Sequence, residues 1–316
     1  MVLENSIYES DGRSQYDEYA IRVLSNRQVL SMILKHTVSA YSSFSIAEIA
    51  ECIDEPSVGD IPVDSNIQGI SQVSKIPGKS IVTYDIRFLA RVPGNKEKHT
   101  YRIMVDVEAQ RNPDPGYDLV TRGIDYAGRM LADQFGVYIT KSQYDNTLKV
   151  YSIWIVMNCP KDYGNSVVEY SISRNNLWGV NERDTRYDLL RVIMVYLLKP
   201  DTTGLNEPTV LHEFLGELFS NHSGREILES LKEKYGILGE EKMEGELNVM
   251  CNLSEGIYER GYENGVVSGI ERGIEKGRLA FAIDTYLDGL TTKEYIMGKF
   301  NLSADELEEA IKHIDN

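Results

Sequence analysis

The sequence predicts an α/β protein that continues into an acidic helical region at its C-terminal end. Two segments, 80–90 and 101–110, alternate apolar and polar residues with the period-two pattern of strands. A nearly continuous apolar run at 148–158 is typical of a central strand that is covered on both faces. Helical periodicity around these segments supplies the α elements, and 316 residues, 42% of them hydrophobic, can bury a sizeable core.

The N-terminal part is expected to contain an arm, two helices and a loop. Residues 1–20 show little periodicity, which predicts a loose arm. From Ile21 to Ile53, apolar residues recur at helical spacing and predict two helices with a break around Tyr41–Phe44. Residues 54–79 contain several Pro and Gly residues, so they are predicted to be mainly loop, with room for a short strand.

The two alternating segments are predicted to form an antiparallel hairpin, because the turn residues Pro93, Gly94 and Asn95 lie between them. Residues 117–135 predict a helix after a breaker-rich loop. Its expected apolar face consists of Val120, Ile124, Ala127 and Leu131. Its expected polar face consists of Asp118, Arg122, Tyr126 and Arg129. After residue 187 we expect three helical segments, at 187–198, 209–219 and 225–236.

The C-terminal region, 201–316, differs from the rest of the chain in its sequence pattern. Glycine recurs every fourth residue over 261–277. Each such glycine costs a helix about 1 kcal/mol relative to alanine. Either another backbone packs closely on this stripe, in a homodimer or against the chain's own body, or the segment is a flexible linker. The oligomeric state of a chain ending near residue 239 separates these alternatives. Two short helices follow; their acidic residues favour a small packing unit over a DNA-binding helix-turn-helix.

Charge and composition limit the classes of partner. The net charge is −16, but residues 80–199 carry +2 while residues 200–316 carry −13. The acidity therefore does not exclude a polyanionic ligand at the centre of the chain. The sequence contains no run of 18 apolar residues and no apolar stretch typical of a signal peptide. Three scattered cysteines argue against a disulfide framework or zinc finger, so we expect a cytoplasmic protein without a membrane partner.

Acidic residues converge on one face of the predicted hairpin. Asp85 lies on that face of the first strand, and Asp106, Glu108 and Gln110 share it on the second. A turn centred near residues 95–96 would place Asp85 opposite Asp106, with Glu108 as a diagonal neighbour. Carboxylates so close repel unless a divalent cation or a proton neutralises them, and hard oxygen ligands suit Mg²⁺.

These motifs resemble a known nuclease group. YDIRF, VDVEAQ and PGYDLVTRGIDYAGRM carry Asp85, then Glu108-Ala109-Gln110, then Arg122 and Tyr126 on the following helix. In this combination the chain resembles the PD-(D/E)XK nuclease superfamily, and within it the recombination-promoting nuclease (Rpn) or PD-(D/E)XK transposase group, over roughly residues 21–200. The chain departs from the wider superfamily where Gln110 replaces the lysine and Tyr84 replaces the proline.

The resemblance implies a restriction-endonuclease-like core in the order αβββαβ with a mixed sheet, and metal-dependent hydrolysis of DNA linked to recombination or transposition. It implies Asp85, Glu108 and the Ala109 carbonyl as ligands of Mg²⁺, with Mn²⁺ as a substitute. Gln110 would orient the attacking water or contact the phosphate. The implied nucleic-acid-binding residues are Arg122, Tyr126 and Arg129.

Each of these roles has a structural alternative. The carboxylates could be ordinary charges on a solvated sheet face, and Asp106 either a further ligand or a partner of Arg87 or Arg102. Gln110 could serve only as a structural hydrogen-bonder, and Asp118 could pair with Arg122 on a polar helix face. For the whole protein, the alternatives are a non-catalytic DNA-binding or protein-interaction module of the same fold and a nuclease that acts on RNA.

Overall fold

The computed structural model describes residues 16–54, 57–58, 73–74, 82–94, 102–135, 139, 142–199, 202–239 and 241–314. The chain divides into two compact units, Met1–Ser254 and Glu255–Asn316. The boundary lies later than residue 200, where we expected it, because the first helices after that residue belong to the unit that holds the sheet.

The N-terminal helices surround a break, as predicted. Residues 16–24 are helical, and three short elements follow: α2 (Arg27–Thr37), the 3₁₀ turn η1 (Ser39–Tyr41) and α3 (Ile46–Ala50). The Asn26 side chain caps α2 by accepting hydrogen bonds from two backbone N–H groups. The expected arm is wrong for residues 16–20, whose helix buries Tyr16 and Ala20; residues 1–15 lie outside the described part.

Among the described residues, six strands form one mixed sheet, which confirms the predicted α/β class. In spatial order they are β1 (Ser57–Val58), β4 (Ile86–Arg91), β5 (Arg102–Gln110), β6 (Lys149–Cys159), β8 (Leu190–Leu198) and β7 (Ser166–Ser171). Strands β5, β6 and β8 are parallel, and the other three pair antiparallel with their neighbours. A separate ribbon pairs β2 (Val73–Ser74) with β3 (Val82–Thr83).

The expected strand over 80–90 is divided into two. β3 belongs to the separate ribbon, Tyr84 lies outside both strands, and Asp85 forms a bend before β4 enters the main sheet. The antiparallel hairpin of β4 and β5 is confirmed; its connection at 95–101 lies outside the described residues. The division places Asp85 at the end of a sheet strand rather than in the middle of one.

The apolar run at 148–158 is confirmed as the central strand β6, which is almost entirely buried between β5 and β8. The helix expected after Tyr187 is wrong, because Leu190–Leu198 forms strand β8. Short apolar runs do not distinguish a buried helix from a buried strand, and the β-branched residues Val192, Ile193 and Val195 favour the strand.

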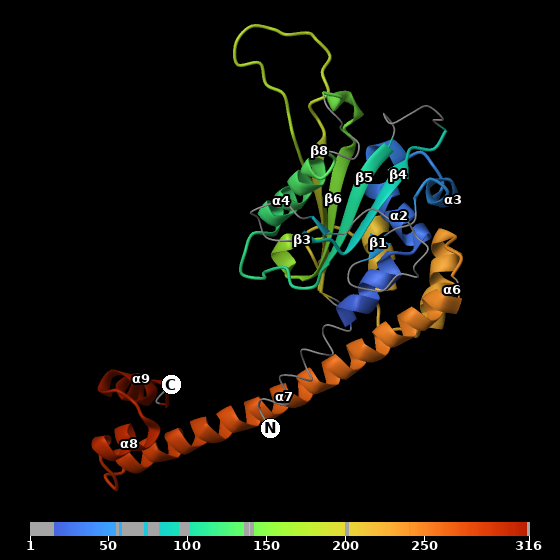
Figure 1. The fold of residues 1–316 in the computed structure, drawn as a ribbon. Coiled ribbons are helices and arrows are strands. Elements are labelled where there is room, and N and C mark those ends of the chain that lie inside the picture. Colours follow the sequence, from blue (N-terminus) through green and yellow to red (C-terminus); the bar gives the residue numbers. More distant parts are fainter. Residues whose placement is uncertain are drawn as a thin grey trace. The chain divides into compact units, whose positions relative to one another are not determined.

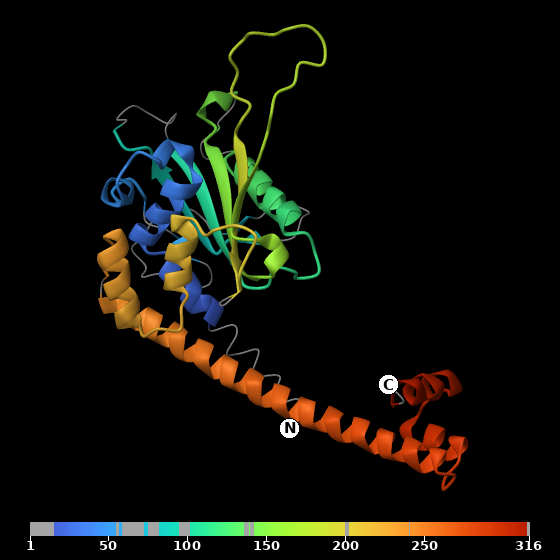
Figure 2. The same ribbon diagram turned by 180° about the vertical axis from the view of Figure 1, so that it is seen from behind.

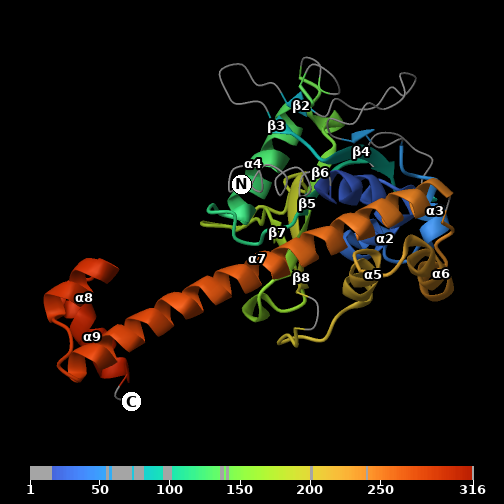
Figure 3. The same ribbon diagram turned by 90° about the horizontal axis from the view of Figure 1, so that it is seen from below.

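Helices cover both faces of the sheet. Figures 1 and 2 show α4 (Leu119–Ala132) on one face and α2 with α5 (Val210–Leu218) on the other, and the view in Figure 3 separates these layers. The short turns η3 (Tyr144–Asn146) and η4 (Lys161–Tyr163) precede and follow β6. Both sheet faces are therefore buried, and side chains on either one must satisfy their polar groups inside the protein.

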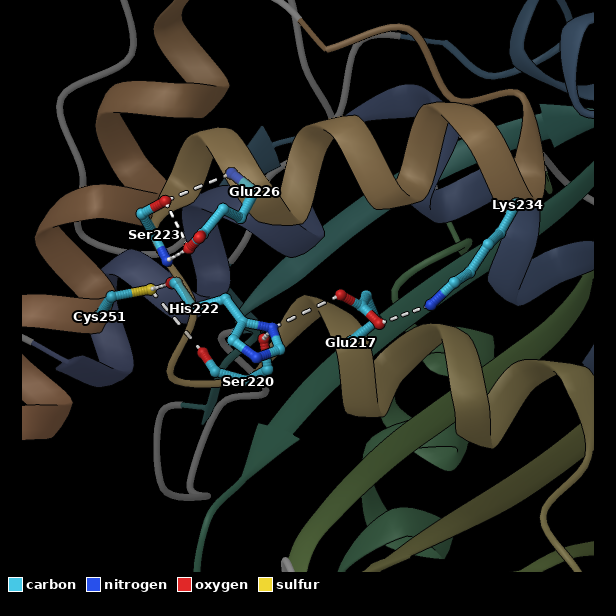
Figure 4. A network of polar contacts seen from close by, with 7 residues as sticks. All are labelled: Glu217, Ser220, His222, Ser223, Glu226, Lys234 and Cys251. Carbon is cyan, nitrogen blue, oxygen red and sulfur yellow. Dashed lines mark hydrogen bonds and ion pairs between the residues drawn. The ribbon is translucent and has the colours of Figure 1, made fainter.

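Polar contacts join the helices that follow the sheet. Here α5 and α6 (Gly224–Tyr235) confirm two of the predicted helices. Glu217, near the end of α5, lies between Lys234 of α6 and His222 (Figure 4). Its carboxylate is 3.1 Å from Lys234 Nζ and 3.7 Å from His222 Nδ1. The Cys251 thiol of the next helix lies 2.9 Å from the His222 carbonyl. These contacts fix the turn between α5 and α6.

The C-terminal unit is a small helical packing unit, as predicted. The end of α7 (Glu241–Leu287), α8 (Lys293–Phe300) and α9 (Ala304–Ile314) bring together Ile283, Ile296 and Leu307, which are buried. The glycine series lies inside the continuous helix α7. A methyl group added at Gly269, Gly273 or Gly277 would meet no described atom within 4 Å. At these three positions the stripe does not pack closely against the described residues of its own unit.

Candidate active site

Asp85 and Glu108 meet at the edge of the β4–β5 hairpin. Ile86 pairs with Val107 and Arg87 with Asp106, and the same register places Asp85 opposite Glu108. The Asp85 backbone N–H donates to Glu108 Oε1 at 3.0 Å, and the Ala109 N–H donates to Asp85 Oδ2 at 3.0 Å. Each carboxylate therefore bonds the backbone of the other strand, and the two acidic groups point into one small space.

The expected pairing of Asp85 with Asp106 is wrong by two residues: Glu108 is the direct neighbour, and Arg87 faces Asp106. Displacing the centre of a hairpin connection by one residue changes every partner by two and leaves each side chain on its original face. The three carboxylates thus share a face as expected, although their order across the strands differs.

Asp106 is the deepest of the three acidic residues, with 0% of its surface exposed, against 4% for Glu108. Its Oδ2 accepts a hydrogen bond from the Ser152 hydroxyl at 3.1 Å, and Ser152 accepts one from the Trp154 indole at 2.9 Å. Within the described residues, Asp106 Oδ1 receives no hydrogen bond. A proton on Glu108 or a bound cation would satisfy this buried oxygen.

Burial raises the pKa of all three carboxyl groups. It raises the pKa of Asp85 to about 6, although the Ala109 N–H and Arg122 oppose the shift. It raises the pKa of Asp106 to about 7. The pKa of Glu108 lies well above its usual range because the group is buried and faces the charges of Asp106 and Asp85. Three negative charges repel in such a space, so the cluster favours a bound proton or cation.

Ala109 and Gln110 complete the motif at the end of β5. The hydrogen bond from Ala109 N–H to Asp85 holds this peptide beside the carboxylates. The Gln110 side chain is partly buried, and its amide donates to the Asn112 carbonyl at 2.7 Å. Gln110 thus has a hydrogen-bond partner in the loop after β5. This agrees with the structural alternative, in which Gln110 serves only as a hydrogen-bonder.

The predicted faces of helix α4 are confirmed only in part: Ala127 is buried and Val120 and Leu131 pack against the core, but three other residues differ from the prediction. Ile124, expected in the core, is 47% exposed, whereas Tyr126 and Arg129, expected outside, are buried. The sheet beneath α4 presents carboxylates and aromatic rings, which accept these amphipathic side chains as partners. Gly123 allows the close approach, because a methyl group there would lie 2.7 Å from Val192 Cγ1.

Arg122 stands beside the carboxylates. Its guanidinium donates to the Tyr126 hydroxyl at 2.7 Å and to the Tyr117 hydroxyl, and lies over the Trp154 ring at 5.5 Å. It is close enough to Asp85 to lower the pKa of that carboxyl. Asp118 caps α4 through the Thr121 N–H, and the side-chain pair of Asp118 with Arg122, the structural alternative, is not formed.

Arg129, predicted to bind nucleic acid with Arg122, lies in a different environment. It is 8% exposed, and its Nε donates to Asp125 Oδ2 at 2.7 Å. Arg102, considered as a partner of Asp106, instead pairs with Asp54. Of the predicted nucleic-acid-binding residues, the structure therefore brings Arg122 and Tyr126 to the carboxylates and encloses Arg129 against its own helix.

The sequence interpretation missed Ser152, and it considered Arg87 only as a partner of Asp106. Ser152 is an isolated hydroxyl in the apolar run of β6, and such an interruption signals a buried polar partner on the adjacent strand. Arg87 alternates in phase with Asp85, which places it on the carboxylate face. It is buried, contacts the Met104 sulfur at 3.2 Å and pairs with Asp133 at 3.3 Å.

Within the described residues, no three His, Cys, Asp or Glu side chains are arranged to chelate one metal ion. A metal here would rely on two carboxylates together with backbone oxygen and water, as Mg²⁺ commonly does. No described helix has both the length and the apolar character needed to cross a membrane. Comparisons with protein-family models, curated proteins and solved structures gave no match to this chain.

Proposed function

We propose that this chain is a metal-dependent endonuclease with a PD-(D/E)XK core that hydrolyses phosphodiester bonds in DNA. The observation that carries the proposal is the reciprocal contact of Asp85 and Glu108 across the hairpin, with Arg122 beside them. The chain order β4, β5, α4, β6, with β5 parallel to β6, supports the proposed core. The link to recombination or transposition rests on the family resemblance of the motifs.

The residues present fit a hard divalent cation. Three carboxylates crowd one buried space, and an oxygen of Asp106 lacks a hydrogen-bond donor among the described residues. Asp85, Glu108 and the Ala109 carbonyl would hold the cation, and its charge would offset their repulsion. When bound, Mg²⁺ or Mn²⁺ supplies a water of lowered pKa and positive charge beside the phosphate.

The chain's own side chains would position the substrate. The Arg122 guanidinium donates to phosphate oxygens, and Tyr117 and Tyr126 hold it in place through their hydroxyls. The Gln110 amide neither takes a proton nor carries charge, so its part is limited to orienting water or contacting the phosphate. Arg129 is buried and pairs with Asp125 of the same helix, so it is a weaker candidate than Arg122 for a phosphate contact.

A plasmid-nicking assay with Mg²⁺ or Mn²⁺ tests the proposal, using Asp85→Asn and Glu108→Gln as near-isosteric variants. Loss of a metal ligand should lower the rate by at least about a hundredfold. Glu182→Gln is the matched control, because Glu182 is an exposed carboxylate in the long segment between β7 and β8. Urea midpoints of all variants show whether they remain folded.

The outcomes separate the rival functions. Equal nicking by the wild type and both site variants would identify a contaminant and overturn the proposal. DNA binding without metal-dependent cleavage would favour a non-catalytic DNA-binding module. This module is the second candidate function, because the Gln110 side chain already bonds the Asn112 carbonyl and so has a structural role. Cleavage of an RNA of the same sequence, but not of DNA, would change the substrate class.

Two further expectations stay as proposals. Cys52, Cys159 and Cys251 are free thiols, which supports a reducing, cytoplasmic location. A homodimer through the C-terminal helical region also stays a prediction. Within their own unit, Gly269, Gly273 and Gly277 have open surroundings, which leaves that stripe available to a second copy. The oligomeric state of a chain that ends near Gly239 tests it, and an unchanged state would remove it.

A further inference from the structure

A second feature beside the candidate site is a pocket of about 470 Å³ at the N-terminal end of α4. Its walls include Asp114, Tyr117, Asp118, Val120, Tyr163 and Tyr196. Most of them follow β5 and β6 or lie near the end of β8, the three parallel strands. In open α/β sheets, ligands bind beyond the carboxyl ends of parallel strands, so this pocket has the usual position for one.

Tyr117 connects this pocket to the carboxylate site. Its ring lines the pocket, its hydroxyl accepts a hydrogen bond from Arg122, and the guanidinium lies 5.4 Å from the centre of the ring. Arg122 is also close enough to Asp85 to lower the pKa of that carboxyl. A group bound in the pocket would therefore lie next to a phosphate held at Arg122.

The lining of the pocket does not suit a phosphate. The described residues that line it include two carboxylates and no Lys or Arg. A free helix N-terminus would attract an anion, but the Asp118 carboxylate already fills that position and accepts the Thr121 N–H at 2.6 Å. The charges in this pocket instead favour a ligand that donates hydrogen bonds.

The same lining suits a flat aromatic ring. Three tyrosine rings contribute to it, and Tyr163 and Tyr196 meet edge to face with their centroids 5.2 Å apart. Aromatic side chains bind bases by stacking regardless of base identity, and a carboxylate accepts from an exocyclic amino group such as N4 of cytosine. A nucleobase with an amino group meets both conditions.

We infer that this pocket receives an unpaired, amino-bearing nucleobase from the nucleotide next to the phosphate at Arg122. The inference rests on the proposed function, because that phosphate belongs to the strand to be cut. A base enters such a concave site only after it leaves its stack, so the preferred substrate is single-stranded or locally opened nucleic acid.

Fluorescence anisotropy in EDTA tests the pocket without any cleavage. The labelled probes are three strands of equal length: oligo(dC), oligo(dT) and a fully abasic sugar-phosphate chain. The wild type should bind oligo(dC) most tightly and the abasic chain least tightly. Tyr163→Ala should weaken binding of oligo(dC) by about five- to 150-fold, the range for one lost stacking contact, and leave binding of the abasic chain unchanged.

Two matched variants separate stacking from amino recognition. Tyr163→Phe keeps the ring and should bind oligo(dC) as the wild type does. Asp114→Asn removes a charged acceptor and should reduce the preference for oligo(dC) over oligo(dT) by about tenfold. Tyr163 is partly exposed, and urea midpoints confirm that each variant is folded.

The result can overturn the pocket and the nuclease separately. Equal binding of the base-containing and abasic chains by the wild type would overturn the pocket, as would an equal loss for both chains in Tyr163→Ala. Base-dependent binding without metal-dependent nicking would support the pocket and overturn the nuclease. Metal-dependent nicking without base-dependent binding would support the nuclease and overturn the pocket.

Discussion

Neighbouring residues of β5 enter two different buried environments. On the face covered by α2 and α5, the cross-strand pairs are apolar: Ile86 with Val107, Phe88 with Val105, and Ala90 with Ile103. On the face covered by α4, Leu89 pairs with Met104, but Arg87 pairs with Asp106, and Asp85 lies opposite Glu108. Equal burial therefore does not mean equal chemistry.

The difference between the two faces indicates that the buried carboxylates on the α4 face are not needed to build the sheet. Charges inside a protein cost stability unless partners neutralise them, and the apolar face shows that this sheet can be built without any. The α4 face retains three carboxylates whose raised pKa values reflect this cost. We therefore expect the two faces to respond in opposite ways to the same kind of substitution.

The largest expected effect comes from adjacent residues on the two faces. Val105→Asp places a charge on the apolar face without a partner and should lower the free energy of unfolding by roughly 3–5 kcal/mol. Asp106→Asn removes a charge from the α4 face and keeps an acceptor for Ser152, so the metal-free protein should be unchanged or more stable at pH 8. Urea unfolding measures both. An equal loss in the two variants would mean that the buried charges stabilise the fold.

A smaller effect should appear as a dependence on pH. The folded-state pKa of Asp85 is about 6 and that of Asp106 about 7, both above the unfolded value near 4. The folded protein therefore holds these protons more tightly. The stabilisation is complete below about pH 4 and is lost as the pH rises to about 7, by up to about 1.4 kcal/mol per pH unit for each proton.

Urea unfolding between pH 5 and pH 8 in EDTA checks this dependence. Glu108→Gln should reduce the slope, because one buried charge is removed, and the exposed control Glu182→Gln should not. Mg²⁺ at a hundred times its dissociation constant should restore about 2.7 kcal/mol at pH 8 in the wild type and in Glu182→Gln, but not in Glu108→Gln. A flat metal-free profile would contradict the buried-charge account, and no response to Mg²⁺ would contradict the cation site.

Part of this arrangement could be predicted from the sequence. Period-two alternation identified the hairpin, and it placed Asp85, Asp106 and Glu108 on one face because a side chain keeps its face through any even change of register. The residue that lies opposite Asp85 depends on the geometry of the connection between β4 and β5, and the residue types in that connection do not define this geometry. The buried strand β8 could not be separated from a helix, since a short apolar run fits both.

The orientation of α4 could not be predicted for a different reason. Ranking side chains by hydrophobicity places Ile124 inside and Arg129 outside, whereas the structure does the reverse. The ranking assumes a wholly apolar surface beneath the helix, whereas the sheet presents carboxylates and aromatic rings there beside apolar side chains such as Val192 and Met194. Tertiary partners thus decided the face of the helix, and these become visible only once strands distant in sequence are paired.

The smallest expected effect tests how closely α4 approaches that polar face. Gly123→Ala would place a methyl group 2.7 Å from Val192 Cγ1 and 3.0 Å from the Trp154 indole nitrogen, so overpacking should cost about 1–3 kcal/mol. Gly128→Ala on the same helix meets no described atom within 4 Å and should gain up to about 1 kcal/mol from helix propensity. The first variant should also slow nicking, because displacing α4 moves Arg122 away from the carboxylates, while the second should not. Equal stability of the two variants in urea would show that α4 does not need its close contact with the sheet, and the position of Arg122 would then require another cause.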